Sequence, residues 1–141
     1  MALTHVPDPN WQIAETSTWA VVLNTDQSLL GRCFCLLKRP ETDVTALTDA
    51  ELASLWELTR RVKQALEDAW EPDHFNYAFL MNLDKQVHFH IIPRYRHKRE
   101  FGGGTYVDSE FGNHYGTGPA RNLEQVGYDS ILNELRKRLN G

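Results

Sequence analysis

The sequence is poor in the features that mark several large protein classes. Only two of its 141 residues are cysteine, and two are methionine. Nowhere do about 18 apolar residues follow one another, which is the length that a membrane-spanning helix needs. The first ten residues also lack the charged start and the apolar run of a secretion signal. We therefore expect a cytoplasmic protein with no membrane partner.

The sequence also has no surplus of positive charge. Lys and Arg number 15 against 19 Asp and Glu, which gives a formal net charge of -4. Proteins that bind nucleic acid non-specifically rely on a basic surface, so we expect no nucleic-acid partner. One basic run remains, from Arg94 to Arg99. Such runs are commonly solvated loops, but beside a phosphate site they can clamp a polyphosphate.

The two cysteines, Cys33 and Cys35, stand two residues apart on an expected strand, so their side chains point to one face. We expect no disulfide between them and interpret them as buried, reduced thiols. The alternative is a metal site shared with two histidines of another strand. That alternative requires thiolates and imidazoles to face one another across the sheet.

The length suits a single domain over residues 1–141, with one core. The pattern of apolar residues predicts an α+β fold in which an antiparallel sheet carries one long helix and a C-terminal helix. Strands are expected twice in 11–24, then in 29–37, 75–81 and 86–92, and helices in 48–70 and 122–139. The long helix should begin at a capping box formed by Thr48 and Glu51. Residues 95–120 are expected to form a long irregular segment, of the kind that often carries function.

The most informative stretch runs from Gln86 to Arg94, with the sequence QVHFHIIPR. Its alternation is that of a strand with one apolar face, so His88 and His90 share the other face. Pro93 lacks an N–H group and should end the strand, which would place both histidines near its C-terminal end. Two imidazoles at this spacing can bind a metal, act on a phosphate, or simply hydrogen-bond in a half-buried sheet. The short connection 83–85 predicts a hairpin that brings the preceding strand end close to them.

The segment His88-Phe-His-Ile-Ile92, followed by Pro-Arg, resembles the signature of the histidine triad (HIT) superfamily, in particular its fragile-histidine-triad branch of dinucleoside-polyphosphate hydrolases. In that register His88 matches the middle histidine and His90 the third. Gln86 replaces the first histidine, and Arg32 stands where many members have a further histidine. The glycine-containing phosphate loop before the triad is shortened to 83–85.

The resemblance implies a HIT-like fold, a homodimer whose sheets join, and a nucleotide as the partner molecule. It also implies hydrolysis or transfer at the α-phosphate, through a covalent nucleotidyl-histidine. The substrate would be a dinucleoside polyphosphate such as diadenosine tetraphosphate, or a nucleoside phosphoramidate. No metal or other cofactor is expected in the protein itself, although such a substrate can carry Mg²⁺.

The resemblance also assigns roles to single residues. His88 would be the nucleophile and His90 would stabilise charge in the transition state. The expected substrate-binding residues are Asn24, Asn82, Gln86 and Arg32. Asn24, seven residues before Gly31, would contact the ribose and Asn82 the phosphates, while the backbone carbonyl of residue 86 would orient His88.

Two other functions fit the same stretch. The first is a nucleotide-binding module with little turnover, which is favoured by Gln86 and the short loop. The second is a metal-binding protein of the cupin type, with His88, His90 and His114 as ligands. The long expected helix argues against the cupin type.

Overall fold

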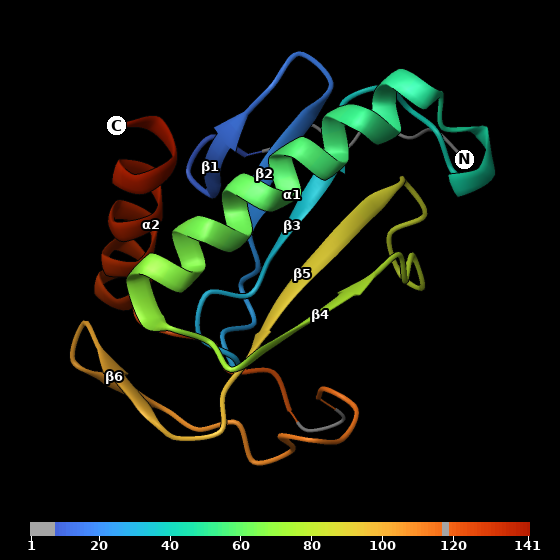
Figure 1. The fold of residues 1–141 in the computed structure, drawn as a ribbon. Helices are drawn as coiled ribbons and strands as arrows, with labels where there is room; N and C mark the ends of the chain where they lie inside the picture. Colours follow the sequence, from blue (N-terminus) through green and yellow to red (C-terminus); the bar gives the residue numbers. More distant parts are fainter. Residues whose placement is uncertain (1–7, 117–118) are drawn as a thin grey trace.

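The computed structural model describes residues 8–116 and 119–141. Five strands form one antiparallel sheet in the order β1-β2-β3-β5-β4, and β6 and β7 form a separate hairpin. The strands are β1 (Gln12–Glu15), β2 (Trp19–Leu23), β3 (Cys33–Leu37), β4 (His74–Ala78), β5 (His88–Arg94), β6 (Arg99–Phe101) and β7 (Gly104–Tyr106). The helices are α1 (Asp49–Trp70), α2 (Gln125–Asn140) and the short 3₁₀ helix η1 (Val44–Ala46). Helix α1 crosses one face of the sheet, and α2 packs beside it against β1 (Figure 1). The predicted α+β fold is confirmed.

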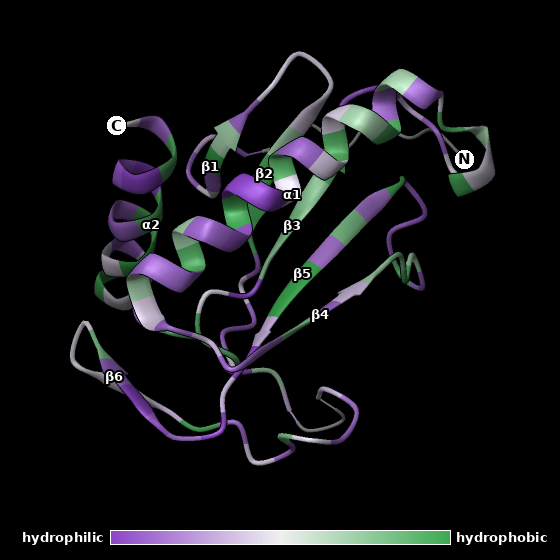
Figure 2. Ribbon diagram, viewed as in Figure 1, coloured by the Kyte–Doolittle hydropathy of each residue, from purple (hydrophilic) through white to green (hydrophobic). Residues whose placement is uncertain are grey.

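Helix α1 begins at the predicted capping box. The Thr48 hydroxyl accepts a hydrogen bond from the Glu51 backbone N–H, and the Glu51 carboxylate accepts one from the Thr48 N–H. Its buried positions follow one another at helical spacing, as in Leu55, Leu58, Val62 and Leu66. In Figure 2 hydrophilic and hydrophobic positions alternate along α1, as expected for a helix with one buried face. None of the described helices is both long and apolar enough to span a membrane.

The strand expected over 29–37 begins only at Cys33, because the chain turns tightly before it. Gly31 has a φ of +87°, which glycine adopts without strain. A Cβ atom at this position would lie 2.7 Å from Leu66 Cδ2 and 2.9 Å from Trp70 Cζ3. The glycine therefore allows both the turn and the close approach of α1.

The prediction that Pro93 ends the histidine strand is wrong. Strand β5 continues to Arg94, so the two histidines lie at its beginning. Pro93 pairs with Phe75 of β4, but on the other side β3 has already ended, with Cys33 opposite Ile91. The missing N–H of Pro93 therefore removes no bond to β3.

Three further boundaries differ from the sequence prediction. Strand β4 ends at Ala78 and Met81 has a φ of +50°, so the connection to β5 covers 79–87 rather than 83–85. The 95–120 segment is not wholly irregular, since the β6–β7 hairpin turns through Gly102 and Gly103, both with positive φ. Helix α2 begins at Gln125 rather than near residue 122.

The two faces of the sheet carry different chemistry. The face covered by the helices holds Cys33, Cys35 and Phe89 in the main core. Both thiols are free and buried, and burial raises the pKa of Cys33 to about 12. His90 and His88 lie opposite Phe34 and Leu36 of β3, which alternate with the two cysteines, and so point to the other face. The alternative of a shared cysteine–histidine metal site is therefore wrong.

Candidate active site

His88 lies at the start of β5 with one ring nitrogen fixed by the backbone. Its Nδ1 is 2.7 Å from the carbonyl oxygen of Gln86. A carbonyl only accepts hydrogen bonds, so Nδ1 carries the proton and, in the neutral ring, the lone pair is on Nε2. The His88 ring is held edge-on by Phe34 at a centroid distance of 5.6 Å. His88 therefore presents an oriented nitrogen nucleophile.

His90 is held in the neutral form. Burial, followed by the nearby His88 and the positive charge of Arg32, lowers the pKa of His90 from 6.5 to about 4. Its ring lies 4.9 Å from that of His88, centroid to centroid. The Nδ1 atom of His90 is buried and has no hydrogen-bond partner among the described residues. A neutral imidazole with an unpaired nitrogen can donate to or accept from a ligand.

Both histidines line a pocket of about 350 Å³. Its remaining walls come from β3 and from the connection between β4 and β5, and consist of Phe34, Leu80, Met81, Asn82, Leu83 and Asp84. The structure thus brings Asn82 together with His88 and His90. Four of the eight lining residues are apolar, and the other four are polar, namely Asn82, Asp84, His88 and His90. This composition is typical of small-molecule sites.

Two other expected residues lie on the same face, beyond the pocket. Arg32 directly precedes β3, and Asn24 is paired with it through a 3.0 Å bond from the Asn24 N–H to the Arg32 carbonyl. The Asn24 side chain accepts from the Asp26 N–H at 2.9 Å and so stabilises a turn. The Arg32 side chain is only 12% exposed; its Nη1 is 3.4 Å from an Asp26 carboxylate oxygen, and its Nε has no described partner.

Gln86 is placed differently from the other expected substrate ligands. Its side-chain Nε2 donates to the Leu37 carbonyl at 2.7 Å, and its backbone N–H donates to Asp84. The side chain is buried and does not line the pocket. Gln86 therefore contributes a carbonyl to His88 while its amide ties the start of β5 to the end of β3.

The comparisons with known proteins agree with this geometry. A family model described as the HIT domain matches residues 12–97, more than half of the chain. The chain belongs to the HIT family. A HIT protein from Sinorhizobium meliloti 1021 has a similar structure, with a TM-score of 0.75 and 20% identity, over 91% of this chain and 88% of that one. No protein with a curated description matches the sequence.

Two more solved structures show the same fold. A histidine triad protein from Bradyrhizobium japonicum has a TM-score of 0.72 and 22% identity, covering 91% of this chain and 89% of that one. A zinc-bound histidine triad family protein from Mycobacterium smegmatis has a TM-score of 0.68 and 16% identity, covering 94% and 86%. Members of the HIT family bind nucleotides.

Arg94, at the end of the HIT motif, does not act as a free cation. Its guanidinium is 2% exposed and forms a two-bond ion pair with Asp108, at 2.7 and 3.2 Å. Three further bonds run to the Asn76 side chain and to the carbonyls of Glu110 and Asn113. All five donors are therefore used, so Arg94 cannot take part in the polyphosphate clamp considered for this run.

Arg99, at the other end of the basic run, is also used within the fold. Its guanidinium donates to the carbonyls of Trp70 and Glu71 at the end of α1, at 2.8 Å in both cases. These bonds satisfy carbonyls that the helix leaves unpaired. The basic run thus supplies structural contacts at both of its ends.

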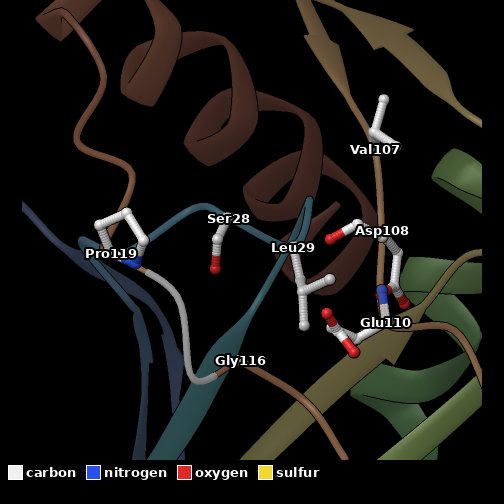
Figure 3. A pocket seen from close by; sticks show the side chains of 8 residues that line it. Ser28, Leu29, Val107, Asp108, Glu110, Gly116 and Pro119 are labelled. Atoms are coloured by element: carbon white, nitrogen blue, oxygen red, sulfur yellow. The ribbon is translucent and has the colours of Figure 1, made fainter. Parts of the chain in front are cut away.

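The HIT domain has a second cavity, of about 290 Å³, away from the histidines. In Figure 3 Ser28 and Leu29 lie between the segment that carries Val107 and Asp108 and the returning segment with Gly116 and Pro119. Among the described residues no basic side chain lines it, and the Asp108 carboxylate is already bound by Arg94. This cavity therefore does not suit a phosphate.

The three-histidine metal site of the cupin alternative is wrong. His114 is exposed, and its Nδ1 is 2.7 Å from the carbonyl oxygen of Tyr115. Within residues 8–116 and 119–141, no three His, Cys, Asp or Glu side chains come together as metal ligands. The HIT fold, with α1 on the sheet, also differs from a cupin barrel.

Sequence reasoning missed two kinds of site residue. Phe34 could have been found, because it alternates with Cys33 and Cys35 and must point to the histidine face. Tyr115 could not. Its ring lies 5.9 Å from the guanidinium carbon of Arg32, a contact across more than eighty residues that no local pattern marks.

Proposed function

We propose that this protein is a nucleotidyl hydrolase or transferase, similar to the fragile-histidine-triad branch of dinucleoside-polyphosphate hydrolases. The observation that carries the proposal is the 2.7 Å contact between His88 Nδ1 and the Gln86 carbonyl. This contact fixes the tautomer that a nitrogen nucleophile needs. The glutamine provides the same carbonyl that a histidine would provide, so the loss of the first triad histidine does not remove this function.

The proposed reaction has two displacements at the α-phosphorus. The Nε2 lone pair of His88 forms a bond to phosphorus, and the bond from phosphorus to the leaving group breaks. The electron pair goes to the leaving group, which takes a proton from solvent. A water molecule then attacks phosphorus and releases a proton to solvent, the phosphorus–nitrogen bond breaks, and Nε2 regains its lone pair as the mononucleotide leaves.

Three side chains would support the developing charge. Neutral His90 is placed to donate a hydrogen bond to a non-bridging oxygen, and exposed Asn82 at the pocket rim can donate its amide. Arg32, whose Nε is buried without a partner, provides a permanent positive charge on the same face. Donors that are positioned before the reaction stabilise developing charge most effectively.

The proposed substrate is a dinucleoside polyphosphate, such as diadenosine tetraphosphate, or a nucleoside phosphoramidate. Its nucleoside would lie along β2 and β3, with the ribose at Asn24. Asn24 currently accepts from the Asp26 N–H; its side-chain NH₂ group remains available to donate to a ribose hydroxyl. We infer no resident cofactor; Mg²⁺ would arrive with the phosphates of the substrate.

We also propose that the protein forms a homodimer through β4. This strand is last in the sheet order, so its outer edge has no partner strand among the described residues. Next to that edge, Trp56 is 47% and Tyr77 40% exposed, and both rings pack on Phe89. A second copy would pair the edge and cover these rings. A Tyr77→Glu variant should then run as a monomer in sedimentation, and a monomeric wild type would refute the dimer.

The test of the catalytic proposal is incubation of the purified protein with diadenosine tetraphosphate and with adenosine 5′-phosphoramidate. Product formation should depend on His88, with His88→Ala as the control. A quench in denaturant at alkaline pH should preserve a nucleotidyl adduct, which mass spectrometry would locate on the peptide that contains His88. Binding of both nucleotides without turnover would instead favour the alternative, a nucleotide-binding module.

A further inference from the structure

The segment from Asp108 to Gly116 is tied to the strand of the nucleophile by one side chain. Arg94 and His90 lie on the same face of β5, four residues apart. The Arg94 guanidinium binds the Asp108 carboxylate and the Glu110 and Asn113 carbonyls. Asp108 also accepts from the Tyr95 N–H at 3.1 Å. The segment is thus held at several points over its first six residues.

The end of this segment lies on Arg32. Directly after Asn113, the rings of His114 and Tyr115 stack at 4.4 Å, and Tyr115 faces the Arg32 guanidinium at 5.9 Å. A Cβ atom on Gly116 would be 4.0 Å from Arg32 Nη1. Together with Asp26, these groups fix a long side chain that would otherwise have many rotamers.

Arg32 in turn acts on the site. On the same face, His90 lies opposite Phe34, two residues from Arg32, and the Arg32 charge contributes to lowering the pKa of His90, after burial and His88. Of the other elements around His90, β4 presents uncharged Ala78 opposite it, and Asp84 of the 79–87 connection lines the same pocket. The buried Nε of Arg32 and Nδ1 of His90 both lack a described partner. An anionic oxygen of a substrate would satisfy such groups.

We propose that Tyr115 is a positioning residue, held in place by the Arg94–Asp108 pair, that fixes Arg32 beside His90 to receive a phosphate oxygen. This inference rests on the proposed function. It adds that the 108–116 segment, more than seventy residues from Arg32 in sequence, determines how strongly the site stabilises charge. Tyr115 itself touches Arg32 through its ring, so the hydroxyl is dispensable.

The test compares Tyr115→Ala with Tyr115→Phe, with Phe111→Ala as the matched control. Phe111 is in the same segment, but its ring packs on Arg96 at 4.8 Å. Tyr115→Ala should lower kcat about tenfold with a smaller change in KM, and Tyr115→Phe should restore it. In an Arg32→Gln background, Tyr115→Ala should have no further effect, because its partner is gone. Equal losses in Tyr115→Ala and Phe111→Ala, or additive losses with Arg32→Gln, would overturn the proposal.

A second measurement does not require turnover. The His90 imidazole can be titrated by NMR in the wild type, Tyr115→Ala and Arg32→Gln. If Tyr115 holds the Arg32 charge near His90, both variants raise the pKa of His90, and Phe111→Ala leaves it unchanged. An unchanged pKa in Tyr115→Ala would refute the positioning role even if hydrolysis is observed. If Tyr115→Ala raised the pKa of His90 but the wild type showed no turnover, the proposed hydrolase activity would be refuted, whereas the positioning of Arg32 by Tyr115 would be supported.

Discussion

The two faces of the sheet bury different kinds of side chain, although the same strands form both faces. On the helix-covered face, residues such as Cys35 and Ile91 are fully buried and belong to the main hydrophobic core. On the opposite face, His88, His90 and Arg94 are also buried, being 8%, 8% and 2% exposed. They share that face with a small apolar cluster of Ala20, Val22 and Leu36, and each of the three polar side chains is held by a named contact or keeps an unpaired atom.

The comparison separates stability from function. Burying a polar group is costly unless it is hydrogen-bonded, and unpaired atoms occur on both faces: Thr59 Oγ1 and Trp70 Nε1 on α1, and Arg32 Nε and His90 Nδ1 on the histidine face. The helix face has the residues that hold the domain together. The histidine face has the residues to which we assign nucleotide binding. Substitutions on the helix-covered face should therefore lower the free energy of unfolding, whereas substitutions on the histidine face should lower catalytic activity.

The largest expected effect on the histidine face comes from His88→Ala. The nucleophile has no substitute in the pocket, so kcat/KM should fall by roughly 10⁴-fold or more. The melting temperature should change little, because the substitution removes one hydrogen bond at the pocket surface. Thermal unfolding and hydrolysis are measured on the same preparation. If His88→Ala kept activity within about tenfold of wild type, His88 would not be the nucleophile.

His90→Ala should be damaging, but less so. Losing one donor that stabilises charge in the transition state typically costs on the order of 10²–10³ in kcat. Steady-state kinetics of the two variants side by side give the ranking. If His90→Ala were the more severe of the two, the assignment of nucleophile and stabiliser would have to be exchanged.

On the helix face, Leu66→Ala should show the opposite pattern. Leu66 of α1 is fully buried against the Gly31 turn. Its truncation should lower the free energy of unfolding by about 2–5 kcal/mol. Below the unfolding transition, kcat/KM per folded molecule should stay close to wild type. Denaturant unfolding and kinetics at low temperature check both. A large loss of kcat/KM in the folded variant would show that the two faces are coupled.

His90 also predicts how stability depends on pH. Its pKa is about 4 in the folded protein against an ordinary value of 6.5, so between these values the unfolded state binds more protons. The contribution of neutral His90 is present above pH 6.5 and is lost as the pH falls towards 4. The free energy of unfolding should therefore decrease less over this window in His90→Asn than in wild type. If the two curves of unfolding free energy against pH were parallel, the pKa of His90 would not be lowered in the folded protein.

The smallest effect is expected for Gln86→His. If residue 86 acts through its backbone carbonyl, hydrolysis should stay within a few-fold of wild type. A histidine there can become charged near pH 6–7, so kcat/KM against pH should gain one acidic-limb ionisation that wild type lacks. If the pH profiles of wild type and Gln86→His were superimposable, the charge of a histidine at position 86 would have no effect on the nucleophile. A collapse of activity would show that the bond from the Gln86 amide to Leu37 is essential.

Local patterns predicted much of this architecture, for physical reasons that can be identified. The capping box, the helical spacing of α1 and the alternation around His88 are all interactions between near neighbours, so the sequence displays them. Pro93 was misplaced because its tolerance depends on where β3 ends, which the local sequence does not contain. The contacts of Arg94 and Tyr115 link distant segments, and charged residues in a basic run give no sign of such partners.

The measurement that tests the account most directly is the stereochemical outcome at the α-phosphorus. A substrate with a chiral phosphorothioate at that position is hydrolysed in isotopically labelled water, and the configuration of the product is determined. Attack by His88 Nε2 followed by attack of water inverts phosphorus twice, so the account predicts overall retention. Overall inversion would mean that water attacks the substrate directly, and would contradict a nucleotidyl-histidine intermediate.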